Sequence, residues 1–392
     1  MCFKCVSKTW LSLIEEDLLL VKQLSRLDRN NLHENRKELI LTANLSKDNS
    51  RGEIQKIRKL KSSRPNEILG PVHGFICLVD KLTEVVRVYN LSTRERTPSV
   101  RSRLRRVQPL PGFSLFKTYQ LGYDPTTKIH KILSVRYVYR QHGQNNNYPG
   151  DLYVLCDVLT IGDNAWRRID EVPPCFGIGF TSVYLNGYIY YCTTTLSTFT
   201  SGNPGNSDIV LVAFDLGSEK FRMIRIPEFI LNSPPSEFVF NQHANLLEVD
   251  GHVAIACRMS AYIVKLWVCR EDNKGKKTTN ANFCNVEENW TEDTILLPLP
   301  FDWDPNIHWG FYTGVGTHQI LVRSTHWSDS GIKCTLYSYD LQKKSFTKIH
   351  FHGIPSSIRN GCNFKVSTFA ESLLPIQKQR SSSGEPHSNI QQ

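Results

Sequence analysis

The stretch DIVLVAFDLGSEKFRMIRIP, at residues 208–227, contains the pattern that decides the fold. A run of apolar and β-branched residues ends at Phe214, and a polar turn opens at Asp215. A second run begins at Phe221, six residues after Asp215, and stops at Pro227. Two such runs separated by turn-forming residues predict a β-hairpin.

The same hairpin pattern recurs along the chain. In residues 336–351, Asp340 and Phe346 take the places of Asp215 and Phe221. Weaker copies, in which the turn or the return strand is less regular, occupy residues 86–100, 152–169 and 264–297. A unit that repeats at this spacing indicates a repeat architecture and not a set of unrelated hairpins.

A second hairpin precedes several of these units. Residues 182–191 and 246–256 each contain the Asn-Gly or Asp-Gly pair that a two-residue primed turn needs, and residues 309–323 precede the copy at 336–351. Two hairpins per repeat make a four-stranded sheet, and such sheets repeated around an axis form a β-propeller. At about 45 residues per blade, the roughly 300 residues of the all-β region at 39–369 give six or seven blades. Only five repeat units are legible in the sequence, so we predict a β-propeller of five to seven four-stranded blades. One large β-sandwich or barrel is the alternative.

Closure of the ring is expected to involve the far end of the chain. The unit at residues 75–100 is short of one strand, and FKVSTF at residues 364–369 has the apolar alternation of a strand. We therefore expect residues 364–369 to complete the sheet of residues 75–100. Trp166, Phe221 and Phe346 each begin a return strand, and we expect them to fill the space between neighbouring blades.

The chain is basic, with a formal net charge of +10 and a pI near 9.0. Such a charge favours binding to nucleic acid or to an anionic membrane surface. However, the positive charge is concentrated in residues 56–64 and 94–106, which carry no recognisable groove-reading helix, zinc finger or RNA-binding signature. No apolar run is long enough to span a bilayer. We therefore expect neither nucleic acid nor a membrane as a partner.

The eleven cysteines indicate a reducing compartment. The number is odd, no hydrophobic signal segment opens the chain, and most of the cysteines lie in apolar strand patterns. These core positions are Cys77, Cys156, Cys192, Cys257 and Cys269. We expect a cytoplasmic or nuclear protein whose thiols behave as small apolar side chains.

The N-terminal region differs from the rest in its periodicity. Apolar residues recur at intervals of three and four, which predicts one face of a helix, at Phe3, Val6, Trp10 and Leu13. The leucine-rich residues 18–27 predict a second helix, and ELILTA at residues 38–43 predicts a first strand. We expect a surface loop at residues 46–64 and a disordered tail at residues 377–392.

Several motifs resemble a known family. CFKCVSKTWLSLI at residues 2–14 resembles the last helix of an F-box. Further motifs occur in the order typical of plant F-box associated domains of the type-three kind: GPVHGFICL at 70–78, LGYDP at 121–125 with KILSV at 131–135, VLTIG at 158–162, LNGYIYY at 185–191 and FDLGSEKF at 214–221. This resemblance implies a β-propeller that recognises substrates for a Skp, cullin and F-box ubiquitin ligase.

One departure from the family affects the expected partners. The Leu-Pro-x-Asp-Leu half of an F-box, which supplies most of the adaptor-binding surface in the family, is absent. The resemblance therefore implies that residues 1–30 are a C-terminal remnant of an F-box. Phe3, Val6, Trp10 and Leu13 would be a remnant of the adaptor interface, and the link to a Skp-type adaptor would be weakened. The alternatives are a ligase substrate receptor, a binding domain without an adaptor, and a propeller enzyme with a central-channel site.

No motif points to catalysis, a metal or a cofactor. Cys2 and Cys5 lack a second ligand pair, and residues 314–316 lack the third glycine of a dinucleotide-binding motif. His350 and His352 are expected on a solvated strand face. We predict no enzyme activity, no catalytic residues and no cofactor, and we leave the substrate-binding residues unassigned. Candidate recognition loops are the long polar segments 140–149, 195–207 and 272–288.

Overall fold

The computed structural model covers a chain of 392 residues. It describes residues 17–24, 37–46, 48–60, 67–102, 113–141, 149–173, 175–176, 182–195, 209–231, 244–260, 262–270, 289–298, 307–314, 318–328, 331–352, 364–369, 372 and 376. All structural statements below concern these residues.

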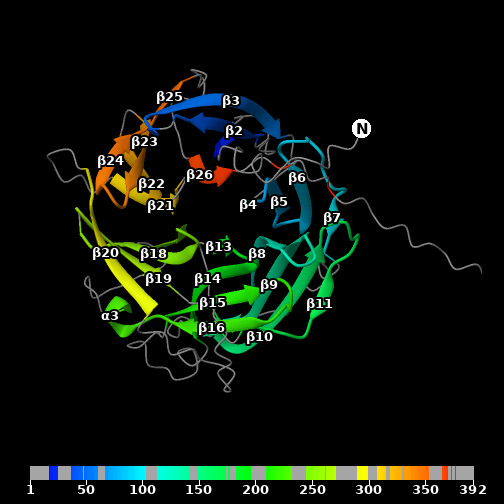
Figure 1. Ribbon diagram of the computed structural model, residues 1–392. Helices are drawn as coiled ribbons and strands as arrows, with labels where there is room; N and C mark the ends of the chain where they lie inside the picture. Colours follow the sequence, from blue (N-terminus) through cyan, green and yellow to red (C-terminus); the bar gives the residue numbers. More distant parts are fainter. Residues whose placement is uncertain are drawn as a thin grey trace, which may run out of the picture.

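The described strands form six sheets arranged in a ring, as the view along the ring axis shows (Figure 1). The only described helix is the single turn α3 (Glu228–Leu231). The expected all-β propeller is confirmed, and the number of described sheets lies within the predicted five to seven. No described helix is long and apolar enough to cross a membrane.

Three sheets follow one another in the first half of the ring, each built mainly from consecutive antiparallel strands. The β4–β7 sheet contains β4 (Glu67–Val72), β5 (Phe75–Asp80), β6 (Val85–Asn90) and β7 (Val100–Arg101). The β8–β11 sheet contains β8 (Phe113–Asp124), β9 (Ile129–Gln141), β10 (Pro149–Thr160) and β11 (Arg167–Ile169). The β12–β16 sheet contains β12 (Cys175–Phe176), β13 (Ser182–Leu185), β14 (Tyr188–Thr195), β15 (Ile209–Asp215) and β16 (Phe221–Arg225).

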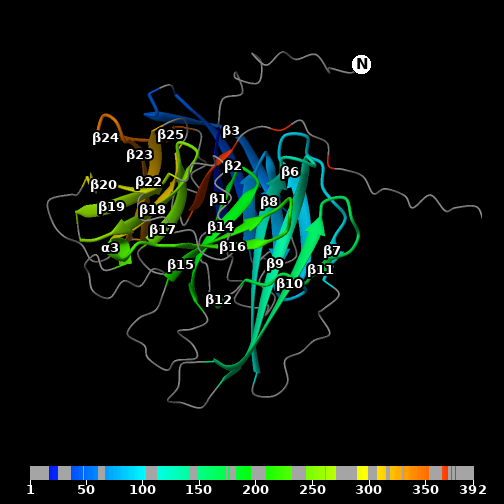
Figure 2. The same cartoon turned by 60° about the horizontal axis from the view of Figure 1, so that its bottom comes forward.

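Two further sheets repeat the four-stranded order. The β17–β20 sheet contains β17 (Ala244–Val249), β18 (His252–Arg258), β19 (Ile263–Cys269) and β20 (Trp290–Leu296). The β21–β24 sheet contains β21 (Ile307–Thr313), β22 (Gln319–Ser328), β23 (Gly331–Asp340) and β24 (Ser345–Lys348). Viewed from the side, the long strands β8, β9 and β10 extend well beyond their neighbours (Figure 2).

The sixth sheet joins the first and last described strands and closes the ring. It has the order β25-β3-β2-β1-β26. Its strands are β1 (Asp17–Leu24), β2 (Lys37–Leu45), β3 (Arg51–Leu60), β25 (His350–His352) and β26 (Phe364–Phe369). We call it the closing sheet, because β26 pairs with β1 antiparallel from Asp17↔Phe369 to Lys22↔Phe364.

Three sequence-based expectations in this region were wrong. Residues 18–27 were expected to be helical, but residues 17–24 form β1, which is paired on both sides by β2 and β26. The run Leu-Leu-Leu-Val in it is continuously apolar, so its periodicity does not separate a buried strand from a helix. Residues 46–64 were expected to be a loop, but residues 51–60 form β3. A β-bulge opposite Thr42 and Ala43 shifts the phase of β3, which hides its alternation.

The third error concerns where the last strand goes. The β4–β7 sheet is completed by β4, which pairs with β5. Strand β26 closes the ring, as expected in general terms, but within the closing sheet and not in the sheet of residues 75–100.

The predicted turn chemistry is present at atomic detail. The Asp215 carboxylate accepts hydrogen bonds from the backbone N–H groups of Gly217 at 2.8 Å and Ser218 at 3.2 Å. Glu219 then takes a positive φ of 58°, which turns the chain back into β16. The Asn186-Gly187 turn has positive φ at both residues, and Leu185 pairs directly with Tyr188, as a two-residue primed turn requires.

Apolar side chains pack mainly between neighbouring sheets. Phe221 lies against a cluster built from the β8–β11 and β12–β16 sheets, with its ring 4.7 Å from that of Phe214. Phe346 occupies the corresponding place against the cluster of the last two four-stranded sheets, and buried Trp166 lies between the β4–β7 and β8–β11 sheets. The expected packing role of these aromatics agrees with their positions.

The cysteines of the predicted core are buried, and none of them forms a disulfide among the described residues. Burial raises the pKa of the Cys77, Cys192 and Cys257 thiols, in the last case to about 12. At neutral pH these groups are therefore uncharged, and they pack as small apolar side chains.

Candidate functional site

A central channel of ≈ 600 Å³ runs along the ring axis. Ligand sites in proteins typically measure about 300 to 1,000 Å³, so the channel has the size of a ligand site. It is lined by the innermost strand of every described sheet, namely β4, β8, β13, β17, β21 and β26. Each of these strands is hydrogen-bonded to its own sheet on one side. Their other edges therefore turn backbone groups toward the axis.

Polar side chains give the channel hydrogen-bonding capacity. Gln120 of β8 is only 4% exposed, and its Oε1 atom has no partner among the described residues. A buried amide oxygen of this kind needs a water molecule or a ligand. The Asn245 side chain accepts a 2.9 Å hydrogen bond from the Phe311 N–H and so ties β17 to β21 across the lining.

An aromatic cluster stands at the β4–β5 turn, where His73 takes a φ of 44°. The His73 ring lies 4.5 Å from the Tyr123 ring and 5.6 Å from the Tyr184 ring. Burial against these rings lowers the pKa of His73, although one side of the turn is open to solvent. Burial also raises the pKa of Tyr184 to about 12. Both groups are therefore uncharged at neutral pH.

These shifts bear on the enzyme alternative. A general base or acid works best with a pKa near the operating pH. Burial moves the pKa of His73 below its usual value and those of Tyr119 and Tyr184 to about 12, away from neutrality in each case. These three groups are therefore suited to packing and hydrogen bonding, and their pKa shifts give no positive sign of catalysis.

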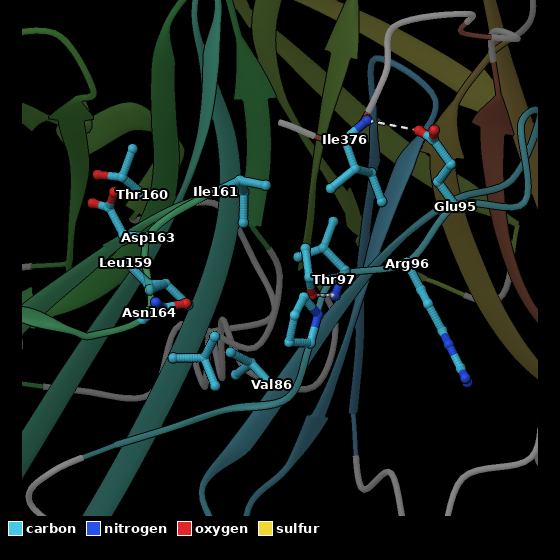
Figure 3. A pocket seen from close by; sticks show the side chains of 14 residues that line it. Val86, Glu95, Arg96, Thr97, Leu159, Thr160, Ile161, Asp163, Asn164 and Ile376 are labelled. Carbon is cyan, nitrogen blue, oxygen red and sulfur yellow. Dashed lines mark hydrogen bonds between the residues drawn. The ribbon is translucent and has the colours of Figure 1, made fainter. Parts of the chain in front are cut away.

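A second cavity, of ≈ 460 Å³, opens between the β4–β7 and β8–β11 sheets (Figure 3). We call it the intersheet cavity. Its floor is formed by buried apolar side chains from both sheets and from one residue near the C-terminus: Val86, Val88, Val100, Leu159, Ile161 and Ile376.

The cavity exists because the outer strand of the β4–β7 sheet is short. Strand β7 pairs with β6 at only two positions. Just before β7, Thr97 pairs with Val88 of β6 in an irregular way. The Val88 N–H donates to the Thr97 side-chain hydroxyl at 2.9 Å, and not to a backbone carbonyl. Pro98 follows and has no N–H to offer. The side chains of β6 are therefore left without the cover that a longer outer strand supplies.

Residues near the C-terminus reach this cavity after β26. The Ser372 N–H donates to the Ser92 hydroxyl at 3.0 Å, and the Ile376 N–H donates to Glu95 Oε2 at 2.8 Å. The Ile376 side chain is buried against the cavity floor (Figure 3). The last described residues thus attach to the sheet that follows the closing sheet.

The rim of the intersheet cavity is polar. Glu95 and Arg96 lie on one side, and Asp163 and Asn164 lie on the other, all of them exposed. In Figure 3 the Arg96 side chain extends away from the cavity, whereas the carboxylates of Glu95 and Asp163 stand on opposite sides of it. The mouth is therefore bordered by negative charge.

Most of the sequence-predicted site residues cannot be placed. Phe3, Val6, Trp10 and Leu13 lie outside the described residues, as do Cys2, Cys5 and nearly all of the three candidate recognition loops. His350 and His352 are exposed on β25, as expected, while Phe351 between them packs over Gly52. The sequence analysis did not predict the intersheet cavity. The available signal was the hairpin copy at residues 86–100, whose return strand is irregular.

The ring of described sheets around a central channel defines a β-propeller. Residues 31–373 match the model of the F-box associated beta propeller domain. The chain therefore belongs to the F-box associated β-propeller family, as its motifs indicated.

Curated relatives are plant F-box proteins. The chain is 25% identical over 305 residues to F-box protein CPR1 of Arabidopsis thaliana, which covers 76% of this chain and 67% of that protein. It is 22% identical over 361 residues to F-box protein At5g65850 of Arabidopsis thaliana, covering 90% of this chain and 80% of the relative. Among solved structures, a chain of a nidogen/laminin complex aligns over 91% of this chain and 99% of its own length, with 9% identity and a TM-score of 0.39.

Proposed function

We propose that this chain is the substrate-recognition part of a Skp, cullin and F-box type ubiquitin ligase and binds target proteins through its propeller. The family match over residues 31–373 is the observation that carries the proposal. The plant relatives are named as F-box proteins, which supports a coupling to an adaptor. The propeller supplies a rigid ring from which recognition surfaces are presented.

The adaptor interface of this chain is expected to be small. Phe3, Val6, Trp10 and Leu13 resemble the apolar face of the last helix of an F-box. One helix of this length offers much less than the roughly 1,200 to 2,000 Å² that a stable interface buries. We expect these residues alone to give weak binding to a Skp-type adaptor.

Titration calorimetry with a purified plant Skp-type adaptor tests this coupling. The full chain should bind only weakly, and a chain joined to the upstream half of an F-box should bind in the micromolar range or tighter. Trp10→Asp in the joined chain is the matched control, because it breaks the apolar face and should abolish binding. Micromolar binding by the chain alone would refute the weak-adaptor expectation. Failure of the joined chain to bind would refute the ligase role itself.

A further inference from the structure

We propose that the intersheet cavity is the docking site for an extended segment of a partner protein. The segment would carry one bulky apolar side chain, with a Lys or Arg within two positions of it. This inference rests on the proposed function as a recognition domain, and it names the surface and the chemistry through which recognition takes place.

The floor of the cavity calls for an apolar guest. Val88, Leu159 and Ile161 are buried, yet they border ≈ 460 Å³ that the protein leaves unfilled. Cavities lined by aliphatic side chains hold water poorly and accept apolar groups. A single side chain that leaves water for such a pocket is the usual anchor of a protein interface. The cavity is large enough for a leucine, isoleucine or phenylalanine side chain.

One residue of the chain itself, Ile376, shows how an apolar side chain is seated there. Ile376 places its side chain on the floor while its backbone N–H donates to Glu95 Oε2 at 2.8 Å. This pair of contacts, an aliphatic side chain and a backbone N–H, is available to any extended peptide. In the sequence, Lys378 follows Ile376 by two positions. The segment that already touches the cavity therefore has the composition that we assign to the partner.

The charge at the mouth selects the flanking residue. Three charged side chains line the cavity, and two of them are the carboxylates of Glu95 and Asp163, on opposite sides of the opening (Figure 3). The third, Arg96, extends away from it (Figure 3). A cationic residue next to the anchor meets these carboxylates, whereas an acidic one is repelled. Charges at a rim contribute mostly to partner choice and association rate.

Selection from a random peptide library displayed on phage, with the full chain as bait, tests the proposal. Enriched peptides should share an aliphatic or aromatic residue with Lys or Arg within two positions. The variant Asp163→Lys should bind a synthetic copy of an enriched peptide with an affinity lower by about fivefold or more, as expected for reversing one exposed charge. Asp170→Lys is the matched control, because Asp170 is also exposed and lies just beyond the other end of the same hairpin. It should leave the affinity unchanged.

Two further measurements locate the binding. Replacing the anchor residue of the peptide by alanine should cost more than tenfold in affinity, as for a buried hot-spot residue. A photoreactive phenylalanine derivative at the anchor position should crosslink to residues 86–100 or 159–164. If Asp163→Lys fails to fold, the variant Glu95→Gln with Asp163→Asn serves instead, since it removes both charges and keeps an acceptor for the Ile376 N–H.

Three results would overturn the proposal: an absence of enriched peptides, enriched peptides without a basic residue, or crosslinks that fall elsewhere on the propeller. Crosslinks elsewhere would leave the recognition function standing at another surface. The adaptor titration does not involve the cavity, so failure of one test is distinguishable from failure of the other.

Discussion

The side-chain amide of Asn90 donates a hydrogen bond of 2.9 Å to the backbone carbonyl of Ser372, which lies 282 positions further along the chain. The Oδ1 atom of the same Asn90 side chain accepts hydrogen bonds from the N–H groups of Ser92 and Thr93 and so holds its own turn. One buried side chain therefore shapes a local turn and fastens the backbone of Ser372 to it. Ring closure is thus extended from the closing sheet to the next sheet.

Replacing Asn90 by alanine should lower the free energy of unfolding by about 2 kcal/mol, because buried backbone groups of Ser372 and of the turn lose their partners. Asp215→Ala is the control, since Asp215 holds an equivalent turn to which no described C-terminal residue is bound. Urea unfolding should show a larger loss for Asn90→Ala by about 1 kcal/mol. Equal losses would show that the contact with Ser372 adds nothing.

Removal of the last strand should open the ring. A chain ending at residue 361 lacks β26, which leaves β1 with an unpaired edge. We expect a strongly lowered melting temperature and rapid proteolysis, because β1 loses the backbone pairing that β26 supplies. The unpaired edge of β1 should also promote aggregation. A chain ending at residue 376 retains β26 and the Ile376 contact, and should melt close to the full chain. If the shorter chain melted as the full one does, β26 would not be needed for closure.

A buried ion pair joins the β4–β7 and β8–β11 sheets. The guanidinium of Arg136 lies 3.1 Å from the Glu84 carboxylate, and each side chain is 3% exposed. Glu84 also pairs with Lys117. Arg136→Met should therefore destabilise the fold by about 2 to 3 kcal/mol, because the buried carboxylate loses one of two cationic partners. Arg168→Met, which removes a more exposed arginine from Asp157, should cost about 1 kcal/mol or less. Chemical denaturation of the two variants checks the difference.

The free energy of unfolding should decrease as the pH is lowered, because of His130. Burial lowers the pKa of His130 from 6.5 to about 4, and its Nε2 atom lies 3.1 Å from the Val72 carbonyl oxygen. The folded state therefore prefers the neutral ring. The resulting stability is complete above pH 6.5 and is lost as the pH falls from 6.5 toward 4, by about 2 to 3 kcal/mol.

Urea unfolding between pH 7.5 and 5 measures this loss. His130→Gln keeps an N–H donor for Val72 but does not titrate, so its stability should vary less over the same range. Identical pH profiles for the two proteins would assign the pH dependence to other groups.

The aromatic residues that begin the return strands should act on stability alone. Phe221→Ala and Phe346→Ala should each cost about 3 kcal/mol, the lower end of the range for phenylalanine, because both rings are partly exposed. Phe229→Ala, on α3 and 47% exposed, is the control and should cost less than about 1 kcal/mol. A variant of Phe221 that melts normally but loses a bound peptide would contradict the packing role.

Local chemistry explains which parts of the fold could be predicted. The turns at Asp215 and at Asn186-Gly187 depend on residues within four positions, so the sequence alone indicated them. Strand β1 is different, because its apolar run becomes a strand only through pairing with β2 and with the distant β26. The bulge in β3 similarly depends on its partner strand.

The intersheet cavity could not be predicted for a related reason. Its walls come from residues 95–98 before β7, from residues 161–164 after β10 and from Ile376. These three parts are far apart in the sequence. The weak return after Asn90 showed that one hairpin was irregular. It did not show that the neighbouring sheet would leave the resulting space open.

Ubiquitin-remnant mass spectrometry in plant cells tests the central claim most directly. The full chain would be joined behind a complete F-box from one of the Arabidopsis relatives, and the same F-box alone would be the control. Recognition by the propeller predicts a defined set of proteins whose ubiquitination rises only with the joined chain. A ubiquitination profile identical to that of the F-box alone would contradict the assignment of this propeller as a substrate-recognition domain.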